Sequence, residues 1–408
     1  MTLDVASIRR DFPVLAREIN DKPLVYLDSA NSSQKPQVVI DALTNFLAHD
    51  YAPISRSAYH LAAQATESFE ATRRALASFI NAKDAAEIVF TKNATESMNL
   101  IVQSWGRANL KSGDVVVLTH MEHHANIVPW QMLAAERGIV LRWVPLTSDY
   151  LLDLTNLETL LDGAKAFSFT SMSNVLGTIN PVQQLCAAAH KVGAIAIVDG
   201  CQSVPHQPTD VQAWGADFVA FSSHKMCGPS GVGVLWGRKQ LLDDMPPFLG
   251  GGNMISEVRL EGFTPAPAPT KFEAGTPAIA EVVALKSAID YLTNIGMANI
   301  RRHEIELSSH VMNTLQDRFG SDLVIHGPSN PELRGATFSF AFRDIHPHDI
   351  SQVLDERNVC IRAGHHCAKP LMKLLGVNAT ARASFYLYNT PEEVDLLADA
   401  LDSASDIF

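Results

Sequence analysis

The sequence lacks several features that would place it in a membrane, on nucleic acid or among disulfide-rich secreted domains. No uninterrupted apolar run reaches the roughly 18–20 residues that a membrane-spanning helix needs, and residues 1–19 carry no apolar stretch typical of a signal peptide. Lys and Arg form no cluster, and the formal net charge is −12. We therefore expect a cytoplasmic protein whose partners include neither nucleic acid nor a membrane.

Cysteine is also scarce. The five cysteines are odd in number and contain no CxxC pair, which favours reduced thiols over a disulfide framework. We interpret Cys186 and Cys201 as small buried hydrophobic residues. Cys367 differs, because it lies in "RAGHHCAKP" between two histidines and a nearby proline. A metal site, a redox-sensing thiol and a catalytic nucleophile all remain open for it at this point.

The sequence is rich in apolar residues, which make up 47% of it, whereas charged residues make up 19%. Its length of 408 residues suggests two domains. Short apolar runs alternate with helical periodicity, which predicts an α/β fold with a mostly parallel sheet covered on both faces. The runs are "EIVFT" (87–91), "VVVLTH" (115–120), "IVLRWV" (139–144), "AFSFTS" (166–171), "AIAIVD" (194–199) and "FVAFSS" (218–223).

The pattern changes after a long predicted helix in "FEAGTPAIAEVVALKSAIDYLTNIG" (272–296). Strands and helices then interleave in a way that predicts a smaller α+β domain, to which the N-terminal helix returns. We assign residues 22–285 to the large domain, and residues 1–21 and 286–408 to the small one. The proline-rich stretch "GFTPAPAPTKFE" (262–273) is expected to be a surface loop within the fold.

Ligands of open α/β sheets bind beyond the carboxyl ends of the strands. Lys225 follows one apolar run directly, in "FSSHKMCGPSGVGVLWG", and Asp199 ends another. Alone, such a lysine is usually solvated and such an aspartate merely caps the next helix. Together they suggest a Schiff base with a pyridoxal phosphate whose pyridine nitrogen faces the carboxylate.

Two further motifs follow strands. "FTKNATESMNL" starts a helix near Thr95, where free N–H groups and the helix dipole favour a phosphate, although a simple N-cap explains it equally well. Ser222 and His224 are placed to complete that site. "MEHHANIVPW" supplies His123 and His124, a weak metal motif, and stacking on a flat cofactor ring or burial in the core are the alternatives.

Taken together, "SSHKMCGPSGVGVLWG", "SNVLGT", "EHHANIVPWQ", "LDSANSSQKP", "FEAGTP" and "RAGHHCAKP" resemble the group II (SufS/CsdA-type) cysteine desulfurases. These are pyridoxal 5′-phosphate enzymes of fold type I, related to the class V aminotransferases, with a large parallel-sheet domain and a smaller α+β C-terminal domain. The resemblance covers essentially the whole chain and implies a homodimer that converts L-cysteine to L-alanine.

The resemblance also assigns roles to individual residues. Those implied to bind the cofactor are Lys225, Asp199, His123, Asn174, Gln202, Ala94, Thr95, Ser222, His224 and, from the other subunit, Thr276. Those implied to bind the substrate are Arg382, Arg362, Asn174 and Arg56. Two positions depart from the family pattern, because Ser55 stands where a His is common and Ala94 where a second Thr is frequent.

The implied reaction uses Lys225 to remove the Cα proton, while His123 assists on the cofactor ring. Cys367 then attacks the substrate sulfur and keeps it as a persulfide for a SufE-like acceptor, in iron–sulfur cluster assembly or other sulfur metabolism. The alternatives are a selenocysteine lyase, another class V lyase, aminotransferase or epimerase, and a non-enzymatic redox-sensing or metal-binding protein. We expect no metal, because adjacent residues point in different directions and no second cysteine stands at ligand spacing.

Overall fold

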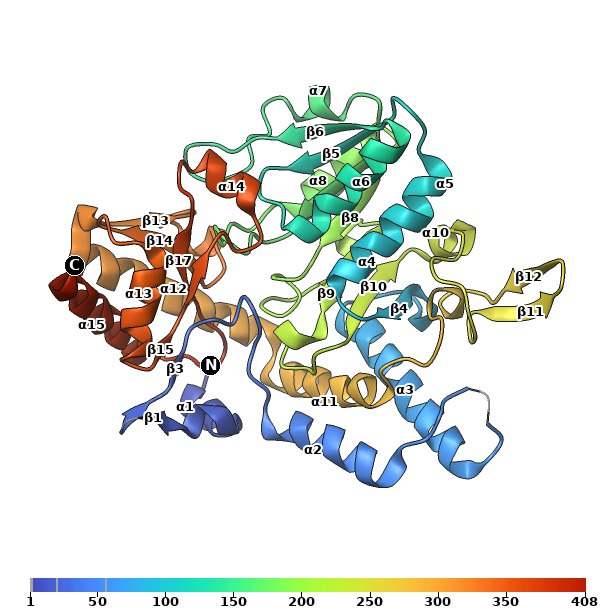
Figure 1. The fold of residues 1–408 in the computed structure, drawn as a ribbon, viewed down its shortest axis with the longest axis horizontal. Helices are drawn as coiled ribbons and strands as arrows, with labels where there is room; N and C mark the ends of the chain where they lie inside the picture. The colour runs from blue at the N-terminus through green and yellow to red at the C-terminus, as the bar shows by residue number, and fades with distance from the viewer. Residues whose placement is uncertain (1–2, 20, 56) are drawn as a thin grey trace.

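The computed structural model describes residues 3–19, 21–55 and 57–408. A larger α/β part, mostly cyan to yellow in Figure 1, lies beside a smaller part in orange and red that contains the C-terminus. The N-terminus lies near the smaller part, so the two ends of the chain flank the same region. Among the described residues, no helix combines the length and the apolarity needed to cross a membrane.

A seven-stranded sheet forms the centre of the larger part, in the order β4-β10-β9-β8-β7-β5-β6. Its pairs are parallel except those of β10, which runs antiparallel to both β9 and β4. The strands are β4 (Ile88–Thr91), β5 (Val115–Thr119), β6 (Val140–Val144), β7 (Ala164–Thr170), β8 (Ile195–Asp199), β9 (Phe218–Ser222) and β10 (Gly233–Gly237). The expected mostly parallel sheet is confirmed, and each of the six apolar runs supplies one of its strands.

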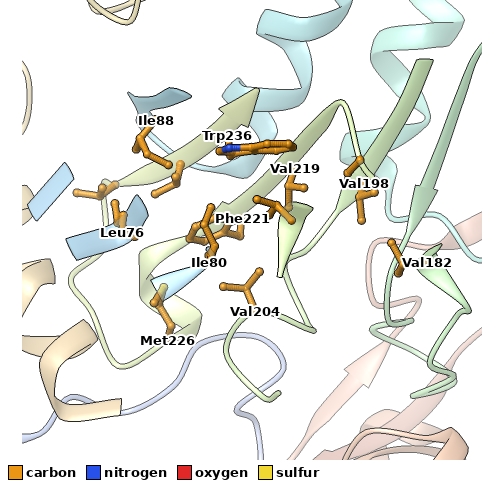
Figure 2. Close-up of a cluster of buried hydrophobic side chains, with 14 of the residues drawn as sticks. Leu76, Ile80, Ile88, Val182, Val198, Val204, Val219, Phe221, Met226 and Trp236 are labelled. Atoms are coloured by element: carbon orange, nitrogen blue, oxygen red, sulfur yellow. The ribbon is translucent and has the colours of Figure 1, made fainter. Parts of the chain in front are cut away.

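Both faces of this sheet are covered, which explains why its strands are continuously apolar. On β5, Val117 packs in one buried cluster with residues of α3 (His60–Phe79) and α11 (Ile279–Ile295), whereas Val116 packs in another with α6 (Val128–Arg137). Figure 2 shows the first cluster around Phe221 of β9, with Met226 reaching into it from the turn after that strand. Met226 is fully buried and therefore anchors the turn that carries Lys225.

Further short helices lie between the strands along the chain. They are α4 (Ala94–Leu100), α5 (Arg107–Asn109), α7 (Leu157–Leu161), α8 (Val182–Lys191), α9 (Val211–Trp214) and α10 (Lys239–Asp244). Of these, α4 and α8 pack on central strands of the sheet. Gly193 follows α8 with a φ of 75°, a left-handed conformation that glycine adopts without steric cost, and the helix ends there.

The smaller part contains an antiparallel four-stranded sheet in the order β13-β14-β17-β16. Its strands are β13 (Leu323–His326), β14 (Thr337–Phe342), β16 (Arg362–Gly364) and β17 (Thr380–Ser384). The helices of this part are α12 (Met297–Phe319), α13 (Pro347–Asp355), α14 (Lys369–Leu374) and α15 (Pro391–Ile407). A separate buried cluster that includes Phe338 and Phe340 joins this sheet to α12, α13 and α15.

The contacts of the chain place the passages between the two parts later than the limits expected at residues 21/22 and 285/286. Strand β3 (Val25–Tyr26) pairs with β15 (Val359–Cys360), so the chain stays with the smaller part beyond residue 21. Helix α11 packs on α3 and on α2 (Gln37–Asn45), so the larger part continues past residue 285. The break between α11 and α12 falls at Gly296, whose φ is 88°, and this is the last residue of the stretch 272–296 in which the long helix was predicted. The remaining N-terminal elements are α1 (Val5–Arg10), β1 (Glu18–Ile19) and β2 (Lys22–Pro23).

The proline-rich stretch 262–273 is not simply a loop, as the sequence suggested. Its first residues form β12 (Gly262–Pro265), which pairs with β11 (Ile255–Arg259) in a hairpin that projects from the larger part in Figure 1. A proline is tolerated there because it ends an edge strand, where its missing N–H is not needed.

Candidate active site

The carboxyl ends of β7, β8 and β9 open into a cavity of about 260 Å³ that the smaller part closes from the other side. The cavity brings together most of the residues singled out in the sequence. Those lining it are Ala94, Thr95, His123, Asn174, Asp199, Gln202, Ser222, His224, Lys225, Arg362, Cys367 and Arg382. Strand ends and the turns after them in the larger part, together with two strand residues and one loop residue of the smaller part, thus line a single cavity, as the converging polar segments predicted.

Lys225 lies in a short 3-10 helix, Ser223–Lys225, that begins where β9 ends. Buried Met226 holds the turn from below, and Gly228 passes so close to Ser223 that an added Cβ would lie 2.2 Å from its Oγ. The N-terminal segment holds the turn from the other side, because the Ser33 N–H and the Lys35 ammonium both donate to the His224 carbonyl at 3.0 Å. The backbone that carries Lys225 is therefore fixed on two sides.

Asp199 ends β8 beside this turn and is almost fully buried. Its Oδ1 accepts the Cys201 N–H at 2.9 Å, so the local capping role considered for it exists alongside its place in the cavity. Cys201 also lines the cavity, contrary to its interpretation as a simple core residue. Burial and the charge of Asp199 raise the pKa of the Cys201 thiol well above its ordinary value, so Cys201 is no nucleophile at neutral pH.

The predicted phosphate site is formed by the start of α4 and the end of β9. Asn93 caps the helix by accepting the Glu96 N–H at 2.9 Å. Ala94 lacks the hydroxyl expected at its position but donates its backbone N–H to Ser222 Oγ at 2.8 Å, which ties the two segments together. The N–H of Thr95 has no acceptor inside the helix, as at any helix start, and is left for an anion.

His123 enters the cavity from the loop after β5. Its Nδ1 accepts the Ala125 N–H at 3.0 Å, so the neutral ring carries its proton on Nε2. Burial, and then the nearby Lys225 ammonium, lower the pKa of His123 to about 4, which keeps the ring uncharged at neutral pH. Glu122 holds this loop by accepting from Asn126 Nδ2 at 2.6 Å and from the Thr170 N–H at 3.1 Å.

Arg382 projects from β17 and is 1% exposed. Its Nη1 donates to the Asn174 carbonyl at 2.9 Å and its Nη2 to Asp28 Oδ1 at 3.0 Å. Its buried Nε has no partner within the described part of the chain. A buried guanidinium N–H without an acceptor, on the wall of a cavity, is suited to bind a carboxylate group of a ligand.

Cys367 lies on a tight loop between β16 and α14. His366 and Cys367 have φ values of 49° and 55°, a left-handed conformation that non-glycine residues adopt only under local constraint. The constraint comes from the other part of the molecule, because Asn174 Nδ2 donates to the His366 carbonyl and the His124 N–H to the Cys367 carbonyl, both at 2.7 Å.

The two histidines before Cys367 are adjacent to it in sequence, but in the structure neither side chain interacts with its thiol. His366 turns away and forms a 2.9 Å hydrogen bond with Thr380 Oγ1, and His365 lies against the ring of His124. The cation beside Cys367 is instead Arg362, whose Nη2 is 3.9 Å from Cys367 Sγ. Within the described residues, no group of three His, Cys, Asp or Glu is arranged to hold a metal ion.

The amides of Asn174 and Gln202 line the cavity, and each already donates one hydrogen bond to a backbone carbonyl. Gln202 Nε2 donates to the Ala30 carbonyl at 2.7 Å, and Asn174 holds the His366 carbonyl. Thr276 lies outside the cavity, exposed beside the segment that follows β12, so its predicted role in a second subunit stays a prediction. Arg56 falls outside the described residues, and neighbouring Ser55 is exposed.

Four residues that position the site were missed in the sequence. They are Asp28, Asn31, Lys35 and Glu122. Asp28, Asn31 and Lys35 belong to "LDSANSSQKP", where the only available signal was the unusual density of small and polar residues after a short strand.

Comparison with known proteins finds matches along almost the whole chain. A family model described as "Aminotransferase class-V" matches residues 25–397. A "Probable cysteine desulfurase" of Streptomyces coelicolor is 50% identical over 412 residues, covering 100% of this chain and 98% of the relative. The apo structure of a cysteine desulfurase from Thermococcus onnurineus has a TM-score of 0.94 at 36% identity, covering 100% of this chain and 99% of that one. The cysteine desulfurase CsdA (S-sulfonic acid) of Escherichia coli has a TM-score of 0.90 at 35% identity, with 100% of both chains covered.

Proposed function

We propose that this chain, which belongs to the aminotransferase class-V family and is a cysteine desulfurase, moves the sulfur of L-cysteine onto Cys367 and releases L-alanine. The observation that carries the proposal is that Lys225, Asp199, Arg382 and Cys367 line one cavity. A redox-sensing thiol alone explains neither the lysine nor the buried arginine with a free N–H.

Pyridoxal 5′-phosphate is the cofactor, and the residues around the cavity fit it. An amine for the covalent link, a buried carboxylate for the ring nitrogen and an N–H-rich helix start for the phosphate all face the same space. When bound, the cofactor supplies an electron sink for the bond changes at the substrate Cα. We assign its binding to Lys225, Asp199, His123, Thr95, Ser222 and His224, with Asn174, Gln202 and the Ala94 N–H in support.

The substrate would be held through its carboxylate. The free Nε of Arg382 offers one donor, and Arg362 offers a second guanidinium on the same wall of the cavity. The planar fork of a guanidinium matches a carboxylate better than an ammonium does. With the substrate fixed in this way, the Lys225 amine is the base on the cavity wall that takes the proton from the substrate Cα.

Sulfur transfer falls to Cys367. Its thiolate forms a bond to the substrate sulfur while the Cβ–Sγ bond breaks, and the electrons of that bond stay with the carbon fragment that becomes alanine after protonation. The product on the protein is a persulfide, Cys367–S–SH. A second thiol must then attack the outer sulfur to return Cys367 to its starting state.

The test is a brief exposure of the holoenzyme to limiting L-cysteine without reductant, followed by mass spectrometry of the Cys367 peptide. We expect one additional sulfur on that peptide and an equal amount of alanine in solution. Full-rate release of free sulfide with no gain in mass would show that sulfur leaves by direct elimination, and the persulfide step would be withdrawn.

The acceptor, the assembly and the location complete the proposal. We propose a SufE-like acceptor protein, because the Cys367 loop is short and tightly held and brings no mobile flank to reach an acceptor itself. A homodimer would bring Thr276 of one subunit to the phosphate site of the other. A cytoplasmic location is supported by five free cysteines, which suit a reducing compartment.

A further inference from the structure

A hydrogen-bonded bridge connects the two arginines on the cavity wall through the N-terminal segment. Arg382 Nη2 donates to Asp28 Oδ1 at 3.0 Å, and Asn31 Nδ2 donates to Asp28 Oδ2 at 3.1 Å. Arg362 Nη1 donates to Asn31 Oδ1 at 3.0 Å, and its Nη2 lies 3.9 Å from Cys367 Sγ. One continuous path therefore runs from the buried arginine to the nucleophile.

Asn31 is the neutral link in this path. Its amide donates to a carboxylate on one side and accepts from a guanidinium on the other, which uses both ends of the side chain. A carboxylate in its place would face Asp28 as a like charge, and an apolar residue would remove the hydrogen bonds that Asp28 Oδ2 and Arg362 Nη1 make to this side chain. Because the Asn31 side chain is exposed, its contacts cost conformational freedom without burying apolar surface, so packing does not explain them.

The consequence falls on Arg362. A guanidinium is rigid and planar, so a bond that fixes Nη1 also fixes the direction of Nη2. Arg362 projects from an edge strand of the smaller sheet. Without Asn31, this long side chain would sample several rotamers, and its positive charge would spend less time beside Cys367.

We propose that Asn31 is a positioning residue, which holds Arg362 against Cys367 and beside the substrate carboxylate. This inference rests on the proposed function, because Arg362 matters only if the cavity binds an amino acid and Cys367 acts on it. Asp28 serves the same bridge from the other end, since it occupies Nη2 of Arg382 and leaves the Nε of that residue for a ligand.

The test compares Asn31→Ala and Asn31→Asp in the holoenzyme, with Asn294→Ala as the matched control, because Asn294 is an exposed asparagine of α11 outside the cavity. We expect Asn31→Ala to raise the KM for L-cysteine about two- to tenfold. It should also slow the alkylation of Cys367 when the holoenzyme is treated with iodoacetamide at fixed pH. The extent of alkylation is measured afterwards on the digested peptide that contains Cys367. Asn31→Asp should raise KM at least as much, because the added charge repels the incoming carboxylate.

Two outcomes overturn the proposal. One is an unchanged KM and alkylation rate in Asn31→Ala with an unchanged melting temperature, which would show that the contact has no role. The other is the same KM and alkylation rate with a lower melting temperature, which would mark a purely structural contact. The proposed function is judged separately, because wild-type enzyme must produce alanine and the Cys367 persulfide in the same assay. If it does so while the Asn31 variants match the control, only the positioning role is lost.

Discussion

Cys367 reaches the cavity on a backbone that costs energy to maintain. Two consecutive non-glycine residues in the left-handed region cost about 1–3 kcal/mol each. That cost is met by hydrogen bonds from Asn174 and His124, which belong to the larger part of the molecule. The thiol is therefore oriented by contacts across the two parts, and exchanging its sulfur for oxygen should leave the loop in place.

We predict that Cys367→Ser retains its cofactor and its melting temperature but loses alanine production from L-cysteine by about two orders of magnitude or more, because a hydroxyl does not take up sulfur in this exchange. Absorbance measures the retained cofactor, and amino-acid analysis measures the alanine that is produced. Cys360→Ser is the control, since Cys360 lies in β15 outside the cavity and should behave as wild type. Normal turnover in Cys367→Ser would return Cys367 to the role of a structural thiol.

At this scale, the sequence pointed to the residues that line the cavity better than to the residues that position them. Lys225 and Asp199 could be found because each follows an apolar strand, and strand ends of a parallel sheet converge. Asn31 and Lys35 could not, because their partners Arg362 and His224 lie far along the chain and only the folded structure brings them together.

Among the elements, β10 illustrates how a strand shapes the site without contributing a side chain to it. Gly233 starts β10 and pairs with both Thr91 and Ser222, the last residues of its two neighbours. A Cβ added at Gly233 would lie 2.3 Å from the carbonyl carbon of Asn93, the residue that caps α4. No side chain can yield there, because the obstacle is backbone.

We predict that Gly233→Ala displaces the start of α4 and weakens cofactor binding, with a loss of about 1–3 kcal/mol of stability. The loss of pyridoxal phosphate on dialysis, followed by absorbance, measures the effect directly. Gly262→Ala is the matched control, because this strand glycine of β12 has nothing within 4 Å of an added Cβ. Equal cofactor retention in the two variants would mean that the turn adapts and that its position is less critical than the geometry indicates.

The parallel strands of the larger sheet could be predicted from the sequence, whereas β10 and the β11–β12 hairpin could not. Continuous apolar runs identified the parallel strands, because burial on both faces leaves little room for polar residues. Strand β10 was not among the predicted strands, and its antiparallel direction could not be predicted either, since "VGVLWG" presents the same apolar pattern whichever way it runs. The β11–β12 hairpin was missed because prolines outweighed the strand signal, although Pro265 only ends β12.

For the molecule as a whole, the cavity that we propose as the active site lies where the larger and smaller parts meet, so we expect the stability of that junction and the activity to be coupled. His366 is the clearest case. It is 1% exposed, its Nε2 bonds to Thr380 Oγ1, and its Nδ1 has no partner within the described residues. Burial and, after it, the positive charges of Arg382 and Arg362 together lower the pKa of His366 to about 2.

The sign of the pH dependence follows from that shift. A histidine in the unfolded chain binds a proton below about pH 6.5, whereas His366 in the folded protein stays neutral until about pH 2. Between these values the unfolded state binds more protons, so the free energy of unfolding falls as the pH is lowered, by up to about 1.4 kcal/mol per pH unit for this group. The contribution is fully present above pH 6.5, and its loss continues toward pH 2.

We therefore predict that the melting temperature decreases between pH 6.5 and pH 5 and that His366→Gln, which cannot be protonated, decreases less over the same range. Because His366 directly precedes Cys367, wild-type desulfurase activity should fall in the same window and recover on return to neutral pH. His49→Gln is the control, since His49 is exposed and its removal should leave the slope unchanged. Parallel slopes in wild type and His366→Gln would contradict the prediction and place the acid sensitivity elsewhere. The half-buried His123 and His224 would be examined next, because partial burial and nearby positive charges lower their pKa values to about 4.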